Sequence, residues 1–168
     1  MSKRSKNVSD EVSKLRNDSR IVKRAHFIAA EREKNKHNIV GVTIIILNVL
    51  IASNLVDVIV STEQSLVIIK LLAFVGAAFA GVQTFFNFQK KAETHLTAGN
   101  IYSKITRKAD ILFAESDGST LSNDKVVSEL KTLVEEYLQA NTDYEASVPT
   151  NQDYDKARVD IRKKDTKE

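Results

Sequence analysis

The side chains best suited to chemistry in this chain of 168 residues are its three histidines, His26, His37 and His95, which lie far apart in the sequence. Glu93 is two residues from His95, so the two side chains would point to different sides of one helix. The chain contains no cysteine nucleophile, no HExxH motif and no glycine-rich phosphate loop. The sequence therefore predicts a protein that is not an enzyme and needs no metal or cofactor. We interpret His95 as a buried hydrogen-bonding residue, with a proton-sensitive role as the alternative.

A second kind of chemistry is indicated by polar side chains within two long apolar runs, residues 39–60 and 66–88. Each run carries a single formal charge, Asp57 in the first and Lys70 in the second. A helix of about 20 apolar residues spans the hydrocarbon core of a bilayer. Only residues 61–65 separate the runs, so we predict two transmembrane helices joined by a short external loop. A buried hairpin within a soluble bundle is the alternative.

The distribution of basic residues predicts which side of the membrane each part of the chain occupies. Residues 1–38 contain eleven Lys and Arg, residues 39–88 contain one, and the remaining 13 follow. Because Lys and Arg are in excess on the cytoplasmic side of membrane proteins, both termini are predicted to be cytoplasmic. Lys36, Lys90 and Lys91 would then mark the lipid interface. The N-terminal segment would attract anionic lipid, whereas its interleaved acidic residues argue against nucleic-acid binding.

The second apolar run has one face of small residues that becomes polar toward the cytoplasm. Projected at 100° per residue, this face lies opposite the bulky residues of the run, such as Phe74 and Phe85. Small and polar residues let helices pack closely and bond one another, but they could also line a pore in an oligomer. Both interpretations stay open. The residues of this face are Ala73, Gly76, Ala77, Ala80, Gln83, Thr84 and Asn87.

The first apolar run has its own polar stripe, formed by Thr43, Asn54 and Asp57. Asn48 lies elsewhere on the helix, near the middle of the run. A polar amide at that depth is unfavourable without a partner, so we expect it to bond another helix or, repeated around a ring, to constrict a channel. Asp57 and Lys70 would form a salt bridge or reach the outer surface, or they would form a charged pore mouth.

Beyond the second run, heptad spacing predicts that the helix continues into the cytoplasm. No helix breaker occurs before Gly118, which predicts one helix over residues 66–114 followed by further helices and a tail over 115–168. The predicted fold is therefore an all-α membrane protein, a two-helix transmembrane hairpin whose long second helix extends into a cytoplasmic helical bundle or coiled coil. The residues of this packing seam are Phe88, Ala92, His95, Gly99, Tyr102, Thr106, Ala109 and Phe113.

Two stretches resemble the SLATT family, KRAHFIAAEREKNKHN before the first run and FFNFQKKAETHLTAGNIYSKI across the end of the second. The resemblance covers about residues 19–161 and is carried by helical periodicity rather than by a reactive motif. SLATT proteins are regarded as two-span effectors of bacterial conflict systems that are proposed to form pores. They are often coupled to nucleotide-signalling or nucleotide-sensing partners. The matching positions are Ala25, His26, Ala29, Ala30, Glu31, Phe86, Phe88, Ala92, His95, Ala98, Gly99 and Tyr102.

The resemblance and the residue pattern together imply an oligomeric effector of the bacterial inner membrane. It would form or gate a pore and depolarise or permeabilise the membrane in antiphage defence by abortive infection. The expected partners are membrane lipid, further copies of the chain, and a nucleotide-signalling or sensor protein encoded nearby. Two alternatives are a membrane-tethered scaffold whose cytoplasmic helices bind a partner, and a holin-like lysis protein.

Overall fold

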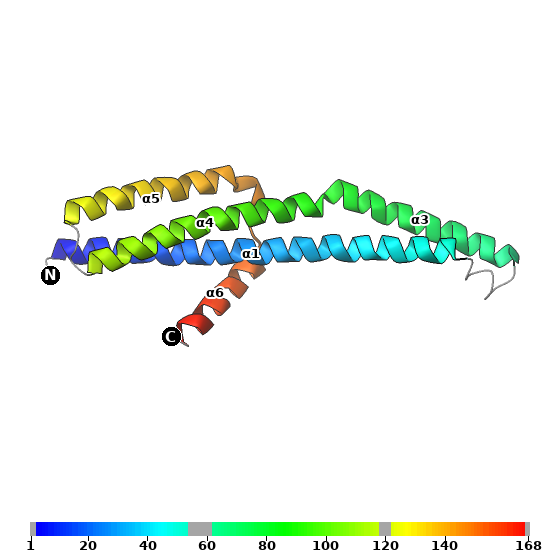
Figure 1. Cartoon of the computed structure of the whole chain (residues 1–168), viewed down its shortest axis with the longest axis horizontal. Helices are drawn as coiled ribbons and strands as arrows, with labels where there is room; N and C mark the ends of the chain where they lie inside the picture. The colour runs from blue at the N-terminus through cyan, green and yellow to red at the C-terminus, as the bar shows by residue number, and fades with distance from the viewer. Residues whose placement is uncertain (1–2, 54–61, 118–121, 167–168) are drawn as a thin grey trace. The chain divides into compact units, whose positions relative to one another are not determined.

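The computed structural model describes residues 3–53, 62–117 and 122–166, and every regular element within these ranges is a helix (Figure 1). No strand occurs within them, which confirms the predicted all-helical fold. Two segments, Val8–Ala52 and Glu63–Ser116, contain a stretch long and apolar enough to cross a membrane. The helices are α1 (Lys3–Ala52), α3 (Thr62–Phe86), α4 (Phe88–Asp117), α5 (Asn123–Asp143), the short 3-10 helix η1 (Glu145–Ser147) and α6 (Asn151–Asp165).

The chain divides into two compact units. Met1–Ala30 and Glu93–Glu168 form the first unit, called here the helical bundle. Glu31–Ala92 form the second, called here the apolar unit. The helical bundle is therefore built from two stretches of chain that are separated in sequence by the whole of the apolar unit.

The helical bundle has an apolar core to which α1, α4 and α5 all contribute, and within this unit the three helices run side by side (Figure 1). Burial of these side chains supplies the main favourable term for packing the three helices. The buried members of a second cluster come from α4 and α5, and Val22 of α1 packs against them. The first cluster comprises Val12, Leu15, Ala109, Leu112, Val126 and Leu133, and the second comprises Ala98, Tyr102, Ile105 and Ala140.

The predicted seam on α4 is the side of that helix with the least exposed surface. His95, Gly99, Tyr102, Thr106 and Ala109 are buried. Phe88, Ala92 and Phe113, at the two ends of the seam, are partly exposed. The seam thus combines small residues, which allow close approach between helices, with polar groups that find partners inside the bundle.

The predicted single helix over residues 66–114 is interrupted at one residue, Asn87, which separates α3 from α4. Asn87 has a φ of 43°, in the left-handed region that asparagine tolerates better than most residues. Its side-chain oxygen accepts a hydrogen bond from the backbone N–H of Lys90 at 3.3 Å, as an N-cap residue does. The interruption was missed because Asn87 was assigned to a polar face by its spacing, whereas its capping ability ends one helix and starts the next.

The boundaries of the predicted external loop also differ from the observed ones. The loop was predicted over residues 61–65, but α3 begins at Thr62. Glu63 lies in the first turn of α3, where a negative side chain stabilises the positive end of the helix dipole. This favourable charge explains why the helix starts before the apolar run does.

A capping box fixes the start of α6. The hydroxyl and backbone N–H of Thr150 both donate to the Asp153 carboxylate, at 2.7 and 2.8 Å, and Asp153 N–H donates back to the Thr150 hydroxyl at 3.4 Å. The Asp153 side chain is buried although it is charged. Ion pairs from Arg24 to Asp160 and from Arg20 to Asp165 join α6 to α1.

Replacing Asp153 by alanine is expected to lower the stability of α6 by about 1 to 2 kcal/mol, because two backbone and hydroxyl donors lose their acceptor. Hydrogen exchange of the α6 amides in the full chain measures this loss directly. Asp155→Ala is the matched control, since Asp155 lies on the same helix and, among the described residues, bonds only to Arg158 in an exposed ion pair. Equal exchange rates in the two variants would contradict the role assigned to the capping box.

Candidate functional site

In the apolar unit, α1 and α3 pack as an antiparallel pair. Gly76 on α3 is buried, and a Cβ atom placed on it would lie 3.9 Å from Leu47 Cδ1, an ordinary van der Waals contact. Gln83 Nε2 lies 3.2 Å from His37 Nδ1, so these two side chains share a hydrogen bond between the helices. Gly41 leaves room for the same Gln83 amide, 3.9 Å from its Cβ position.

The small and polar face predicted on α3 is divided by this packing. Gly76 is buried and Gln83 partly buried against α1. The Thr84 hydroxyl donates to the carbonyl oxygen of Ala80, at 3.0 Å, and so needs no partner from another helix. The rest of the face remains on the surface of the unit: Ala73, Ala77, Ala80, Thr84 and Asn87 are exposed.

Many large apolar side chains are also exposed on the surface of the apolar unit. Phe74 is 74% exposed and Phe85 is 82% exposed. Large contiguous apolar surfaces of this kind are rare on monomeric soluble proteins and mark contact with lipid or with another protein. The further exposed members are Ile39, Val42, Ile45, Ile46, Val49, Leu66, Val67, Leu71, Val82 and Phe86.

The polar residues predicted in the first apolar run have different surroundings. The Thr43 hydroxyl donates to the carbonyl oxygen of Ile39 at 2.8 Å, within its own helix. Asn48 is exposed. Asn54 and Asp57 lie outside the described residues, so their predicted stripe and the predicted pairing of Asp57 with Lys70 stay predictions.

One end of the apolar unit carries basic side chains over aromatic rings. Lys36 Nζ lies 5.9 Å from the centroid of the Phe88 ring, and Lys91 Nζ lies 5.6 Å from that of Phe86. The Phe86 and Phe88 rings stack with centroids 5.6 Å apart. Cations over aromatic faces are stabilised by the ring quadrupole, so this end combines an apolar surface with fixed positive charge.

The buried carboxylate of Glu33 anchors two of the basic residues near that end. It accepts hydrogen bonds from Lys36 at 2.8 Å and from Arg32 at 3.0 Å. Burial acts to raise the pKa of Glu33, but the bonds from Lys36 and Arg32 outweigh it and hold the pKa below its ordinary value. Glu33 therefore stays ionised and orients the cationic side chains around it.

The helical bundle contains a buried pair of histidines, His26 and His95, that their wide separation in sequence does not predict. His26 Nδ1 on α1 lies 3.1 Å from His95 Nδ1 on α4. The His26 ring stacks on the Tyr102 ring, with the two centroids 5.4 Å apart. It also meets the Tyr144 ring edge to face, with centroids 6.5 Å apart. Burial, with a smaller effect of the neighbouring His95, lowers the pKa of His26 from 6.5 to about 4. The His26 ring is therefore neutral at physiological pH, and its Nδ1 atom donates to or accepts from His95 Nδ1 according to the tautomer.

Tyr102 extends this buried polar cluster. Its hydroxyl donates to the side-chain oxygen of Asn141 on α5 at 2.6 Å. Burial raises the pKa of Tyr102 above its ordinary value, so the hydroxyl remains a donor. Farther along the bundle, the hydroxyl oxygens of Ser19 and Thr106 lie 3.1 Å apart. The bundle therefore joins its helices by polar contacts as well as by its apolar core.

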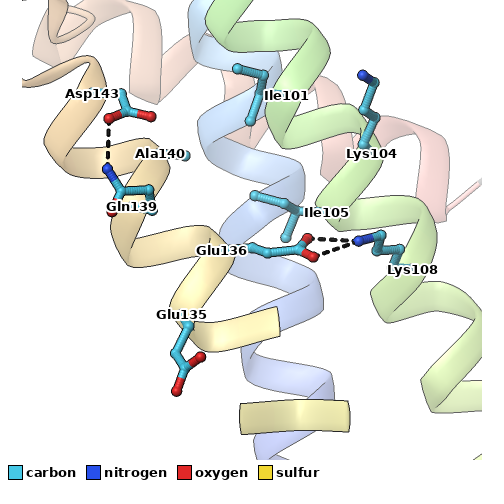
Figure 2. A pocket seen from close by; sticks show the side chains of 9 residues that line it. All are labelled: Ile101, Lys104, Ile105, Lys108, Glu135, Glu136, Gln139, Ala140 and Asp143. Carbon is cyan, nitrogen blue, oxygen red and sulfur yellow. Dashed lines mark hydrogen bonds and ion pairs between the residues drawn. The ribbon is translucent and has the colours of Figure 1, made fainter. Parts of the chain in front are cut away.

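A surface groove runs between α4 and α5 in the helical bundle (Figure 2). Figure 2 shows Ile105 lying between the two helices, beside the ion pair from Lys108 to Glu136. Glu135 projects away from α4 in the same view. The groove has a basic wall from α4, an acidic wall from α5 and an apolar floor. Its lining is completed by Ile101, Lys104, Gln139, Ala140 and Asp143.

Within the described residues, no group of three or more His, Asp or Glu side chains is arranged to hold a metal ion. No family model, curated protein or solved structure matches the chain. The features that remain for function are the exposed apolar surface, its basic and aromatic end, the buried histidine pair and the groove.

Proposed function

We propose that the chain is a two-span protein of the bacterial inner membrane, with both termini in the cytoplasm. The observation that carries this proposal is the exposed apolar surface of the apolar unit, because α1 and α3 pack on each other yet leave their largest side chains uncovered. Lipid tails would cover those side chains. The basic and aromatic end formed by Lys36, Lys91 and the phenylalanines would lie at the cytoplasmic interface.

Several copies of the chain assemble in this proposal and form or gate a pore that depolarises the cell during phage infection. The exposed strip of Ala73, Ala77, Ala80 and Thr84 supports this role, since small side chains leave room for water along one side of α3. The resemblance to SLATT proteins supplies the biological setting and a nucleotide-signalling or sensor protein as the trigger. The protein itself acts without catalysis.

Depolarisation tests the proposal in cells. Expression of the chain with a potential-sensitive dye is expected to show a collapse of membrane potential, either on induction or on phage challenge. No change of potential under either condition would refute pore formation.

The exposed strip can be tested separately, because the chain has no cysteine of its own. Ala80→Cys is expected to react with a membrane-impermeant thiol reagent and to change ion flux on reaction. Phe74→Cys is the matched control: it lies on the bulky side of the same helix and, facing lipid, should not react. If the cysteines at positions 80 and 74 are equally protected from the reagent, Ala80 does not line a pore.

The groove between α4 and α5 favours a second candidate function, a membrane-tethered scaffold that docks a helix of another protein. In that case the apolar unit serves only as an anchor. Replacing residues 39–88 by an unrelated two-span anchor separates the two functions. Retained defence activity would favour the scaffold, and lost activity in a chain that still reaches the membrane would favour the pore.

A further inference from the structure

Asn48 is a polar side chain on an apolar part of α1, and it is exposed on the surface of the apolar unit. The exposed residues close to it on the helix are Ile45, at 62%, and Val49, at 58%. Across the described part of the chain, no hydrogen bond is recorded for the Asn48 amide. In the bilayer interior, where water is absent, such an amide is unfavourable until it finds a partner.

The second helix of the hairpin offers Asn48 nothing to bond. Leu47, its neighbour in sequence, meets Gly76 on α3. Residues 71–82 around Gly76 include no side chain with a polar atom. Among the described residues, the facing part of α3 therefore supplies no partner at this depth, and we look for one outside the chain.

Symmetry identifies that partner. Copies inserted in one membrane with the same topology are related by rotation about the membrane normal, so Asn48 lies at the same depth in every copy. An asparagine amide both donates and accepts, so two of them can bond each other. Ala52, four residues farther along the helix, lies near Asn48 on the same side of α1, is exposed, and would let the backbones approach.

We infer that Asn48 forms the contact between two copies of the chain, with the amide of one copy bonded to the amide of the next. This inference rests on the membrane insertion proposed above. It places the exposed side of α1 that carries Asn48 and Ala52 in an interface between copies rather than against lipid. Asn48 then sets the register of the assembly, since a shift along α1 would leave both amides without a partner.

Disulfide cross-linking in isolated membranes tests the contact. Asn48→Cys is expected to give a covalent dimer on oxidation, because paired positions bring two thiols within bonding distance. Ile46→Cys is the matched control: Ile46 is 54% exposed, but two residues along the helix place it on the opposite side of α1. Comparable dimer yields from both variants would overturn the inference.

The amide itself is tested by comparing Asn48→Leu with Asn48→Gln. Leucine is expected to weaken self-association in lipid, measured by energy transfer between labelled copies, by roughly 3- to 30-fold. Glutamine keeps the amide and should retain association. Unchanged association of the leucine variant would overturn the inference. So would reaction of Asn48→Cys with a membrane-impermeant thiol reagent without dimer formation, because that result would place Asn48 in a water-filled lumen.

The failure of this inference can be told apart from the failure of membrane insertion. Extraction of membranes at alkaline pH releases peripheral proteins but leaves inserted ones. A chain that is released refutes insertion and the inference together. A chain that resists extraction but shows no Asn48-dependent association refutes the contact alone.

Discussion

Replacing Gly99 by valine is expected to lower the free energy of unfolding of the helical bundle by about 2 to 3 kcal/mol, at the upper end of the cost of overpacking a core. The Phe27 ring lies on Gly99, and a Cβ atom there would sit only 3.0 to 3.2 Å from three of the ring carbons. Valine adds two further methyl groups in the same space. The ring and α1 would have to move away from α4 to admit them.

Tyrosine signals measure this effect selectively. The chain has four tyrosines and no tryptophan, and all four tyrosines belong to the helical bundle. Denaturation of the full chain in mild detergent, followed by tyrosine near-ultraviolet circular dichroism, therefore reports on the bundle.

Gly81→Val is the matched control for Gly99→Val, because nothing lies within 4 Å of the Cβ position at Gly81. Combining Gly99→Val with Phe27→Ala should return part of the lost stability, since the smaller side chain removes the clash. If Gly99→Val lowers the free energy of unfolding equally in the Phe27→Ala variant and in the parent chain, the Phe27 ring is not the cause of the loss.

Acidification is expected to destabilise the bundle through His26. The pKa of His26 is about 4 in the folded chain, against 6.5 for an ordinary histidine. Between these two pKa values the unfolded chain binds a proton at His26 and the folded chain does not. The contribution of neutral His26 to folding stability is therefore complete above about pH 6.5 and is lost as the pH falls toward 4. After allowance for solvent screening, the loss is about 2 to 3 kcal/mol.

His26→Gln should flatten this pH dependence, because glutamine can still bond His95 but does not titrate. His37→Gln, in the apolar unit, keeps His26 and should retain the slope. The measurement is bundle stability at steps from pH 7.5 to about 4 in all three proteins, using the tyrosine signal. Identical slopes in the His26→Gln variant and the parent chain would assign the pH dependence to other groups.

The sequence was sufficient to predict the helical fold, because apolar periodicity and the absence of helix breakers are strong local signals. The seam on α4 followed from the same periodicity. The helix interruption at Asn87 was harder to predict, because one residue with a left-handed backbone leaves the pattern of apolar residues unchanged. Its capping ability was visible in the sequence, but an asparagine within a polar face has several possible roles.

Pairs between helices were missed for a different reason. The histidines were judged by their separation in sequence, although an antiparallel hairpin brings together residues at equal distances from its turn. His37 and Gln83 are each 23 residues from position 60, and His26 and His95 are 34 and 35 residues from it. Counting instead from residue 63, the centre of the predicted loop, would have paired His37 with Gln89 and His26 with Asn100, so the rule comes only within five or six residues of the observed partners. It could not have supplied the burial that lowers the pKa of His26, which depends on the neighbouring helices.

The division of the helical bundle between two stretches of chain has a consequence for biosynthesis. Met1–Ala30 leave the ribosome before their partners, which begin at Glu93, after the 62 residues of Glu31–Ala92. At about 5 to 20 residues per second, the N-terminal helix waits several seconds before its partners emerge. The apolar unit is complete before the bundle can close. Translation order thus delays the assembly of the bundle core until the apolar unit has been made, and during that interval chaperones can act on the nascent chain.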